Sequence, residues 1–254
     1  MPTAVPSDTL DHFLCYKAKK GKGEDRFEEK GVWLSDQFQE LHGEERIVDL
    51  SKIEQFCDAV DKDGEGIIDD TAHLTCYKVK PSSKIKPQVI STDQFGDLDL
   101  DVQRGRTQLC VPSLATVIGE PAGMPADALN GEPAPMGPPL EHFELYKAKR
   151  TPKTPQFERR EVDLVDPFLD FDETVKVNRP RRLGVPTDKD GGGIDNDLTH
   201  LTCYAVQAPR FEWRDIEVTN EYHPDGYRLR VRRPKMLCVP SYKLVVSDEM
   251  DIPN

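Results

Sequence analysis

Three short blocks of sequence recur four times along this chain, always in the same order. The first block reads HFLCYKAK in its first copy, and the four copies begin at His12, His73, His142 and His200. The second block is centred on Asp-Gln-Phe or a variant of it, and the third contains Leu-Cys-Val-Pro or a variant of it. Such repetition indicates one small unit that buries its apolar face against its neighbours. The blocks predict units at residues 12–62, 73–114, 142–189 and 200–243.

The four units group into two pairs. A connector that begins DKDGEGI at Asp61 joins the first two units, and a similar one that begins DKDGGGI at Asp188 joins the last two. Residues 119–139 between the pairs are rich in proline and show no apolar periodicity, which is typical of a semi-rigid linker. The sequence therefore predicts two homologous domains, 8–118 and 140–248, joined by the linker 119–139.

The blocks have the alternation of β-strands. Asp97, Asp99 and Asp101 alternate with apolar residues, and so do Arg228, Arg230 and Arg232. A period of two places the apolar residues inward and the charged residues in water. Short strands separated by Gly, Pro and Asp turns predict an all-β protein with two antiparallel β-sandwich-like domains. A short helix in the linker or near residues 51–56 stays an alternative.

The six cysteines follow the repeat. Three units carry one cysteine in the first block and one in the closing block, whereas the third unit has Leu145 and Gly184 at these places. A bridged pair explains this joint loss, because a single orphaned thiol would be a liability. The predicted disulfides are Cys15–Cys57, Cys76–Cys110 and Cys203–Cys238.

Such disulfides indicate an oxidising compartment, namely the periplasm, the cell surface or the extracellular space. The alternative is a cytosolic protein with six reduced core thiols. A metal site formed by the cysteines is disfavoured because the chain has no C-x-x-C pair. The first residues lack a basic start and an apolar stretch, so the sequence shows no signal peptide.

Composition and motifs exclude several classes of function. The formal net charge of −12 argues against nucleic acid as the main partner, since binding to phosphates needs clustered Lys and Arg. No apolar run approaches the length of a membrane-spanning helix. The chain has no G-x-S-x-G, H-E-x-x-H, P-loop or dinucleotide fingerprint, so we expect no enzymatic activity.

The HLTCYKVK, DQFG and LCVPS blocks, together with the DKDGEGI connector, resemble a family of bacterial secreted tandem-repeat β domains of unknown function. The resemblance covers most of the chain outside the linker and the two tails. It implies an exported, disulfide-bonded β domain and carries no activity to transfer. The third unit departs from the pattern by its missing cysteines, and the fourth by Asn220, Glu221 and Tyr222 in place of Asp-Gln-Phe.

The connectors resemble calcium-binding loops, because acidic residues fall at ligand spacing around a glycine. The candidate calcium ligands are Asp61, Asp63, Glu65, Asp69, Asp188 and Asp190. A calcium loop needs an acidic residue at its twelfth position, but Ala72 stands there in the first copy and Thr199 in the second. The alternative is a tight Asp/Gly turn between units. The repeated histidines are predicted to be structural, because each unit has one.

Opposite charges on corresponding strands suggest a role in assembly. The acidic face of Asp97, Asp99 and Asp101 and the basic face of Arg228, Arg230 and Arg232 could bring neighbouring molecules together head to tail. We therefore expect a non-enzymatic structural or assembly protein of the cell exterior.

The alternative is a module that binds carbohydrate or another polyanion, with or without calcium. The arginines at 179, 181 and 182 support it. Trp33, Trp213 or Tyr222 exposed beside the basic face would favour it further.

Overall fold

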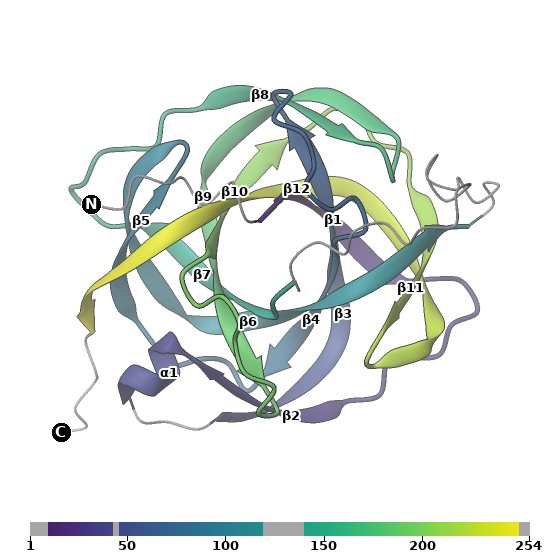
Figure 1. The fold of residues 1–254 in the computed structure, drawn as a ribbon, viewed down its shortest axis with the longest axis horizontal. Helices are drawn as coiled ribbons and strands as arrows, with labels where there is room; N and C mark the ends of the chain where they lie inside the picture. Colours follow the sequence, from purple (N-terminus) through teal and green to yellow (C-terminus); the bar gives the residue numbers. More distant parts are fainter. Residues whose placement is uncertain (1–9, 43–45, 119–139, 249–254) are drawn as a thin grey trace.

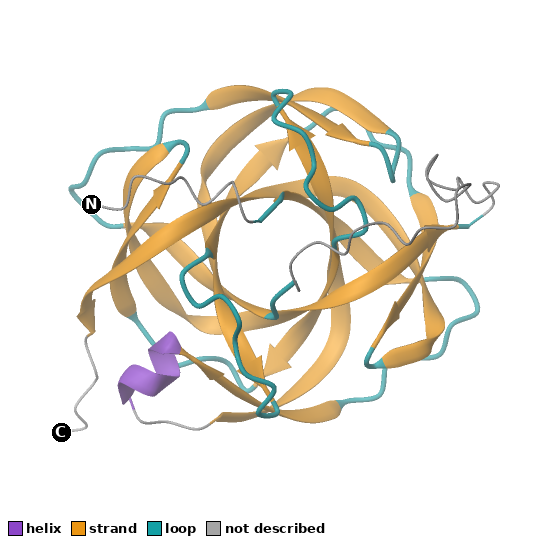
Figure 2. Ribbon diagram, in the orientation of Figure 1, coloured by secondary structure: helices purple, strands orange, loops and turns teal. Residues whose placement is uncertain are grey.

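A computed structural model describes residues 10–42, 46–118 and 140–248 of the chain. About two thirds of them lie in strands, and α1 is the one helix in these ranges (Figure 2). The elements are β1 (His12–Lys20), β2 (Lys30–Asp36), α1 (Gln37–His42), β3 (Arg46–Lys62), β4 (His73–Lys80), β5 (Pro87–Asp93), β6 (Gly96–Val117), β7 (Phe143–Arg150), β8 (Arg160–Asp166), β9 (Phe171–Lys189), β10 (His200–Gln207), β11 (Arg214–Asn220) and β12 (His223–Asp248). The predicted all-β, antiparallel fold class is confirmed, whereas the predicted linker 119–139 lies outside the described residues.

Eight of the strands close into a cylinder. Their order is β1-β3-β4-β6-β7-β9-β10-β12, and β12 pairs again with β1, always antiparallel. Figure 1 looks into this ring, with the four remaining strands β2, β5, β8 and β11 spaced around its periphery. A closed ring of eight strands has an interior just wide enough to be filled by side chains.

Each predicted unit supplies one short cylinder strand, one outer strand and one long strand. The outer strand pairs with the long strand of its own unit and with the end of the long strand two units away. Thus β2 pairs with β3 and β9, β5 with β6 and β12, β8 with β9 and β3, and β11 with β12 and β6. The sheet therefore leaves few unpaired strand edges.

The expectation of two separate sandwiches needs correction. Strand β6 pairs with β7, and β12 pairs with β1, so residues from both halves form one continuous sheet. Two units alone provide only four cylinder strands, and their open edges are paired by the other two units. The boundaries 8–118 and 140–248 stay a prediction about duplication in the sequence.

The interior of the cylinder is built in layers. All three predicted disulfides are confirmed, and each joins two residues that are directly opposite on neighbouring strands. Two residues before the first cysteine position, the facing pairs are apolar: Phe13 and Ala59, Leu74 and Pro112, Phe143 and Pro186, Leu201 and Pro240. Sulfur and apolar side chains thus fill the centre that appears open in the ribbon view.

The third unit replaces its disulfide by a complementary pair. Leu145 and Gly184 are opposite each other on β7 and β9, the position held by a cysteine pair in the other units. A Cβ atom added to Gly184 would lie 2.8 Å from Leu145 Cδ2 and 3.0 Å from Leu201 Cβ. The leucine therefore occupies the space of the missing bridge, and its partner must be glycine. This packing explains why both cysteines are absent together.

The tyrosine of the first block and the aspartate of the second block form a buried hydrogen bond between opposite units. Three such bonds measure 2.6 Å, from Tyr16 to Asp166, from Tyr146 to Asp36 and from Tyr204 to Asp93. In the fourth unit Asn220 takes the place of the aspartate, and its side-chain amide donates to Tyr77 Oη at 3.0 Å. The second oxygen of each acceptor side chain receives a backbone N–H of the following turn, as Asp93 does from Phe95.

We expect removal of one tyrosine hydroxyl to test these bonds. Tyr204→Phe leaves the buried Asp93 carboxyl without its 2.6 Å donor, and should lower the free energy of unfolding by about 2–3 kcal/mol. Tyr77→Phe, which loses only a bond with an amide, should cost about 1 kcal/mol. Urea unfolding of both variants measures the difference. Equal losses would contradict the assigned role of the carboxyl.

Candidate binding site at the basic end of the cylinder

A polar layer follows the sulfur layer inside the cylinder. Two residues beyond the first cysteine position, the opposed pairs are Lys17 and Gln55, Lys78 and Gln108, Lys147 and Arg182, and Ala205 and Met236. Alternation along a strand turns these residues to the same side as the cysteines. One end of the interior is therefore lined by cations and carboxamides in three units, and by apolar residues in the fourth.

Basic residues also gather where the long strands leave the cylinder. Each long strand shows a register shift there, the mark of a bulge at which a strand bends. The basic residues in or beside these bends are Lys52, Arg104, Arg106, Arg179, Arg181, Arg232 and Arg233. This end of the molecule, which we call the basic mouth, therefore concentrates positive charge in a chain whose net charge is −12.

A cavity of about 600 Å³ opens at the basic mouth. Among the described residues, its lining has seven basic side chains and one acidic side chain, Glu54. The basic residues are Lys17, Lys19, Lys20, Arg26, Lys52, Arg182 and Lys235. Such an excess of one charge sign in a hollow attracts ligands of the opposite sign.

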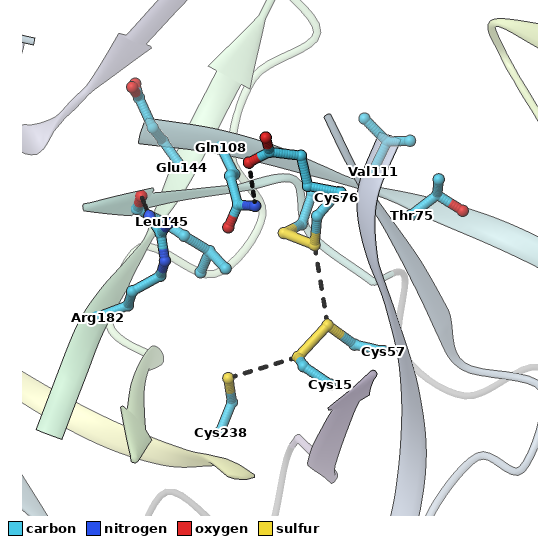
Figure 3. Close-up of a disulfide and its surroundings, with 12 residues drawn as sticks. Cys15, Cys57, Thr75, Cys76, Gln108, Val111, Glu144, Leu145, Arg182 and Cys238 are labelled. Atoms are coloured by element: carbon cyan, nitrogen blue, oxygen red, sulfur yellow. Dashed lines mark hydrogen bonds between the residues drawn. A yellow bond between two sulfur atoms is a disulfide. The ribbon is translucent and has the colours of Figure 1, made fainter. Parts of the chain in front are cut away.

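The floor of the cavity contains polar groups with unused hydrogen-bonding capacity. Gln55 Oε1 and Gln108 Oε1 are buried and receive no hydrogen bond from the described residues. Gln108 Nε2 donates to Glu54 Oε2 at 3.0 Å, and Arg182 Nη1 donates to the Leu145 carbonyl at 3.0 Å. Figure 3 shows Arg182, Gln108 and Leu145 beside the row of sulfur atoms. A ligand that supplies hydroxyl donors and negative charge would satisfy these groups.

Two cations that line the cavity, Arg182 and Lys235, have lowered pKa values. Burial lowers the pKa of Arg182 to about 10, although the Glu54 carboxylate acts in the opposite direction. Burial, and then the positive charges of Arg233 and Lys17, lower the pKa of Lys235. Both shifts mean that the positive charge is insufficiently compensated, so an anion placed here would stabilise the charged forms.

The predicted basic face continues from the mouth along β12. Arg230 is opposite Lys19 on β1, forms a bidentate salt bridge with Asp215 at 2.8 and 2.9 Å, and lies 3.7 Å from the ring centre of Trp213. Trp213 is 54% exposed, so an exposed aromatic ring does lie beside the basic face. Arg228 lies within 4 Å of Glu24 and Glu217.

The predicted acidic face has internal partners as well. Asp97 accepts a bond from Thr92, and Asp101 accepts bonds from Gln88 and Thr151. Asp99, the middle residue of the acidic face, is half-buried. Arg232, the last residue of the basic face, is exposed. Several residues that were expected to join two molecules therefore form hydrogen bonds or ion pairs within one molecule instead.

The connectors do not gather their carboxylates as a calcium loop does. Asp63 adopts a positive φ and accepts the Asp163 backbone N–H, while Asp190 does the same with Trp33. Lys62 donates to Asp63 and Glu65 at 2.8 and 2.6 Å, so its ammonium group occupies the midst of these acids.

The remaining candidate calcium ligands have other roles. Asp61 accepts a bond from the Gly66 N–H, and Asp69 accepts bonds from Thr71. Asp188 Oδ1 is buried and bonds to none of the described residues. Over the ranges that the structure covers, no three His, Cys, Asp or Glu side chains converge as metal ligands would. This geometry favours the tight-turn interpretation, and calcium binding stays an untested prediction.

Both connectors lie at the end opposite the basic mouth. They join the last residue of a long strand to the first residue of a cylinder strand, and the two strands run antiparallel. Exposed acidic residues are frequent there, namely Asp63, Glu65, Asp70, Asp190, Asp195 and Asp197. We call this region the acidic end. The charge of the molecule is therefore polarised along the cylinder axis.

The repeated histidines make contacts suited to structural roles. His12 lies 2.8 Å from Glu65, His142 lies 3.1 Å from Glu221, and His200 contacts the Leu198 carbonyl at 3.0 Å. His73 Nδ1 lies 2.5 Å from Asp58 Oδ1 in a fully buried pair.

The pair of His73 and Asp58 belongs to a buried acidic network with Asp166 and Tyr16. Burial raises the pKa of Asp58 to about 7 and lowers that of His73 to about 4. Burial, and then the neighbouring Asp58, raise the pKa of Asp166 well above its ordinary value. These groups are enclosed in the core, and they serve as internal hydrogen-bonding groups rather than as a surface site.

The sequence contains a signal for the basic mouth that belongs to none of the motifs considered above. Lysine follows the tyrosine of the first block in three of the four units, as Lys17, Lys78 and Lys147, and only Ala205 departs. A polar residue also recurs two places before the second cysteine position, as Gln55 and Gln108 do. Only the closed cylinder brings these positions together at one end.

Comparisons with protein-family models, with curated proteins and with solved structures find no match for this chain. The described segments include no helix with the length and apolar character needed to cross a membrane. The three disulfides are typical of a protein outside the cytoplasm.

Proposed function

We propose that this protein is a non-enzymatic binding module of the cell exterior that binds an anionic polysaccharide at the basic mouth. The observation that supports the proposal most directly is the cavity of about 600 Å³, to which the described part of the chain contributes seven basic side chains and one acidic one. The unbonded oxygens of Gln55 and Gln108 suit the hydroxyl groups of a sugar. Trp213 beside Arg230 offers an aromatic face of the kind that packs against sugar rings.

Titration with polyanions tests this function. Polygalacturonate and dextran sulfate serve as carboxylate and sulfate probes, and neutral dextran serves as the uncharged control. We expect binding of at least one polyanion that weakens as salt rises, because exposed charges are screened. Lys17→Glu combined with Lys235→Glu should weaken it by about tenfold or more, a change of about 1.4 kcal/mol.

The matched control makes the same change in net charge at residues that do not line the cavity. Lys153→Glu combined with Arg159→Glu alters exposed residues of the β7–β8 connection that do not line it. Calorimetric titration should give nearly unchanged affinity for this variant. Absence of binding to both polyanions at low salt, or equal loss in both variants, would contradict the proposal.

Head-to-tail self-association is a second candidate, and the polarised charge supports it. The acidic end of one molecule has the sign that the basic mouth of the next would attract, and such a contact propagates into a chain unless it closes a ring. Sedimentation across a salt series should then show larger species at low salt. Asp195→Lys combined with Asp197→Lys should abolish these species while leaving polysaccharide binding in place, which separates the two candidates.

A further inference from the structure

The three disulfides lie in a row in which neighbouring bridges are in contact. Cys238 Sγ lies 3.7 Å from Cys15 Sγ, and Cys57 Sγ lies 3.8 Å from Cys76 Sγ. Neither contact is a hydrogen bond in the oxidised protein, because a disulfide sulfur carries no proton. Figure 3 shows the sulfur atoms of Cys238, Cys15, Cys57 and Cys76 following one another through the interior. The row therefore begins at Cys203 and ends at Cys110.

The third unit interrupts what would otherwise be a closed ring of bridges. Leu145 and Gly184 stand where a fourth pair would connect the two ends of the row. The row thus has two distinct ends, and each bridge can contact only the next one along it. All six cysteines are at most 1% exposed, so a thiol formed inside the cylinder has only the neighbouring bridges of this row as partners for exchange.

We propose that the six cysteines form a disulfide-exchange ladder, along which a thiol generated at one end moves to the other. A dithiol reductant opens the Cys203–Cys238 bond and is itself oxidised to a disulfide. The Cys238 thiolate then attacks Cys15 Sγ, the Cys15–Cys57 bond breaks, and its electron pair leaves on Cys57. The Cys57 thiolate attacks Cys76 Sγ in the same way and releases Cys110.

The exchange steps involve no net oxidation, since each one forms one sulfur–sulfur bond and breaks another. The product carries the bridges Cys15–Cys238 and Cys57–Cys76, with free thiols at Cys203 and Cys110. Each new bridge joins neighbouring units instead of closing one unit. The attacking sulfur must approach its target by less than about 2 Å, from 3.7 or 3.8 Å to bond length.

The end of the row at Cys203 is suited to hold a thiolate. Its neighbour on β9 is Arg182, and the two residues are opposite each other in the strand register. A cation beside a cysteine favours the thiolate, which is the nucleophile in exchange. The Cys203 end of the ladder thus lies beside the basic mouth, because Arg182 belongs to the lining of the cavity.

A single substitution tests the ladder without any reductant. Cys203→Ala leaves Cys238 as one unpaired thiol in the folded protein. We expect this thiol to be found on Cys57 and Cys110 as well as on Cys238, after an acid quench, alkylation in mildly acidic denaturant and peptide mapping. The mirror variant Cys110→Ala should place the free thiol on Cys15 and Cys203 as well as on Cys76.

Breaking the middle of the row provides the matched control. In Cys203→Ala combined with Cys15→Ala and Cys57→Ala, the thiol should stay on Cys238, because its only neighbour is gone. Wild-type protein reduced by one equivalent of dithiol gives a second measurement that needs no variant, with Cys15–Cys238 and Cys57–Cys76 peptides expected. Native pairs alone in the reduced wild type, or a free thiol only on Cys238 in Cys203→Ala, would overturn the proposal.

Discussion

Cysteines placed at positions 145 and 184 should form a fourth disulfide in the folded protein. These residues face each other on β7 and β9 as the native cysteine pairs do in the other units. The bridge would close a loop close in length to the native ones, whose cysteines are 34 to 42 residues apart, and should stabilise by about 3 kcal/mol. Contact of the new Cβ with Leu201, 3.0 Å away, reduces the gain somewhat.

The reference for this variant is Leu145→Ala combined with Gly184→Ala, which adds the same Cβ atom without a bridge. Urea unfolding of both proteins under oxidising conditions gives the difference in the free energy of unfolding. Peptide mapping by mass spectrometry should show a disulfide between the peptide that contains position 145 and the peptide that contains position 184. Two free thiols at these positions, or equal unfolding midpoints, would show that the third unit is not built like the others.

Asp58→Asn should make the protein less sensitive to rising pH. The folded-state pKa of Asp58 is raised to about 7 by burial, whereas an unfolded aspartate titrates near 3.9. The folded protein therefore keeps a proton that the unfolded chain releases between about pH 4 and pH 7. The stability linked to this group is present at low pH and is lost, on the order of 4 kcal/mol, as pH rises through that window.

Asparagine keeps the shape and the hydrogen-bonding capacity of Asp58 but does not ionise. The variant should thus gain stability relative to wild type as pH rises from about 5 to 8, measured by urea unfolding at each pH. Asp172→Asn changes the same net charge at an exposed site and serves as the control. A constant difference between Asp58→Asn and wild type across this range would mean that Asp58 is not held protonated by the core.

The sequence alone predicted the strands and the disulfides because both depend on patterns within one unit. Alternation identifies which face of a strand is buried, and the joint replacement of two cysteines by Leu145 and Gly184 identifies the partners. The role of the aspartate in the second block was not predicted, because its tyrosine partner belongs to the unit two places away. Patterns within a unit do not reveal which other unit covers it.

The same limit explains why the candidate site was only partly predicted. The arginines at 179, 181 and 182 suggested an anion, and Arg182 does line the cavity. Lys17 and Gln55 are opposite each other on β1 and β3, and Gln108 lies on β6 of the next unit. Arg182 on β9 joins them in one lining only because both halves of the chain share one cylinder. The two-sandwich expectation placed Arg182 in the second domain, apart from the other three residues.

Closure of the cylinder determines how this chain can reach its native state. The first described strand, β1, pairs with the last one, β12, and all four tyrosine bonds link opposite units. Consecutive strands of the ring can pair as they form, but the ring and the tyrosine bonds between opposite units are complete only when the last strand is in place, so most contacts join residues distant in sequence. Such a topology folds slowly. It also resists piecemeal opening, since no segment can detach without exposing strand edges on both sides.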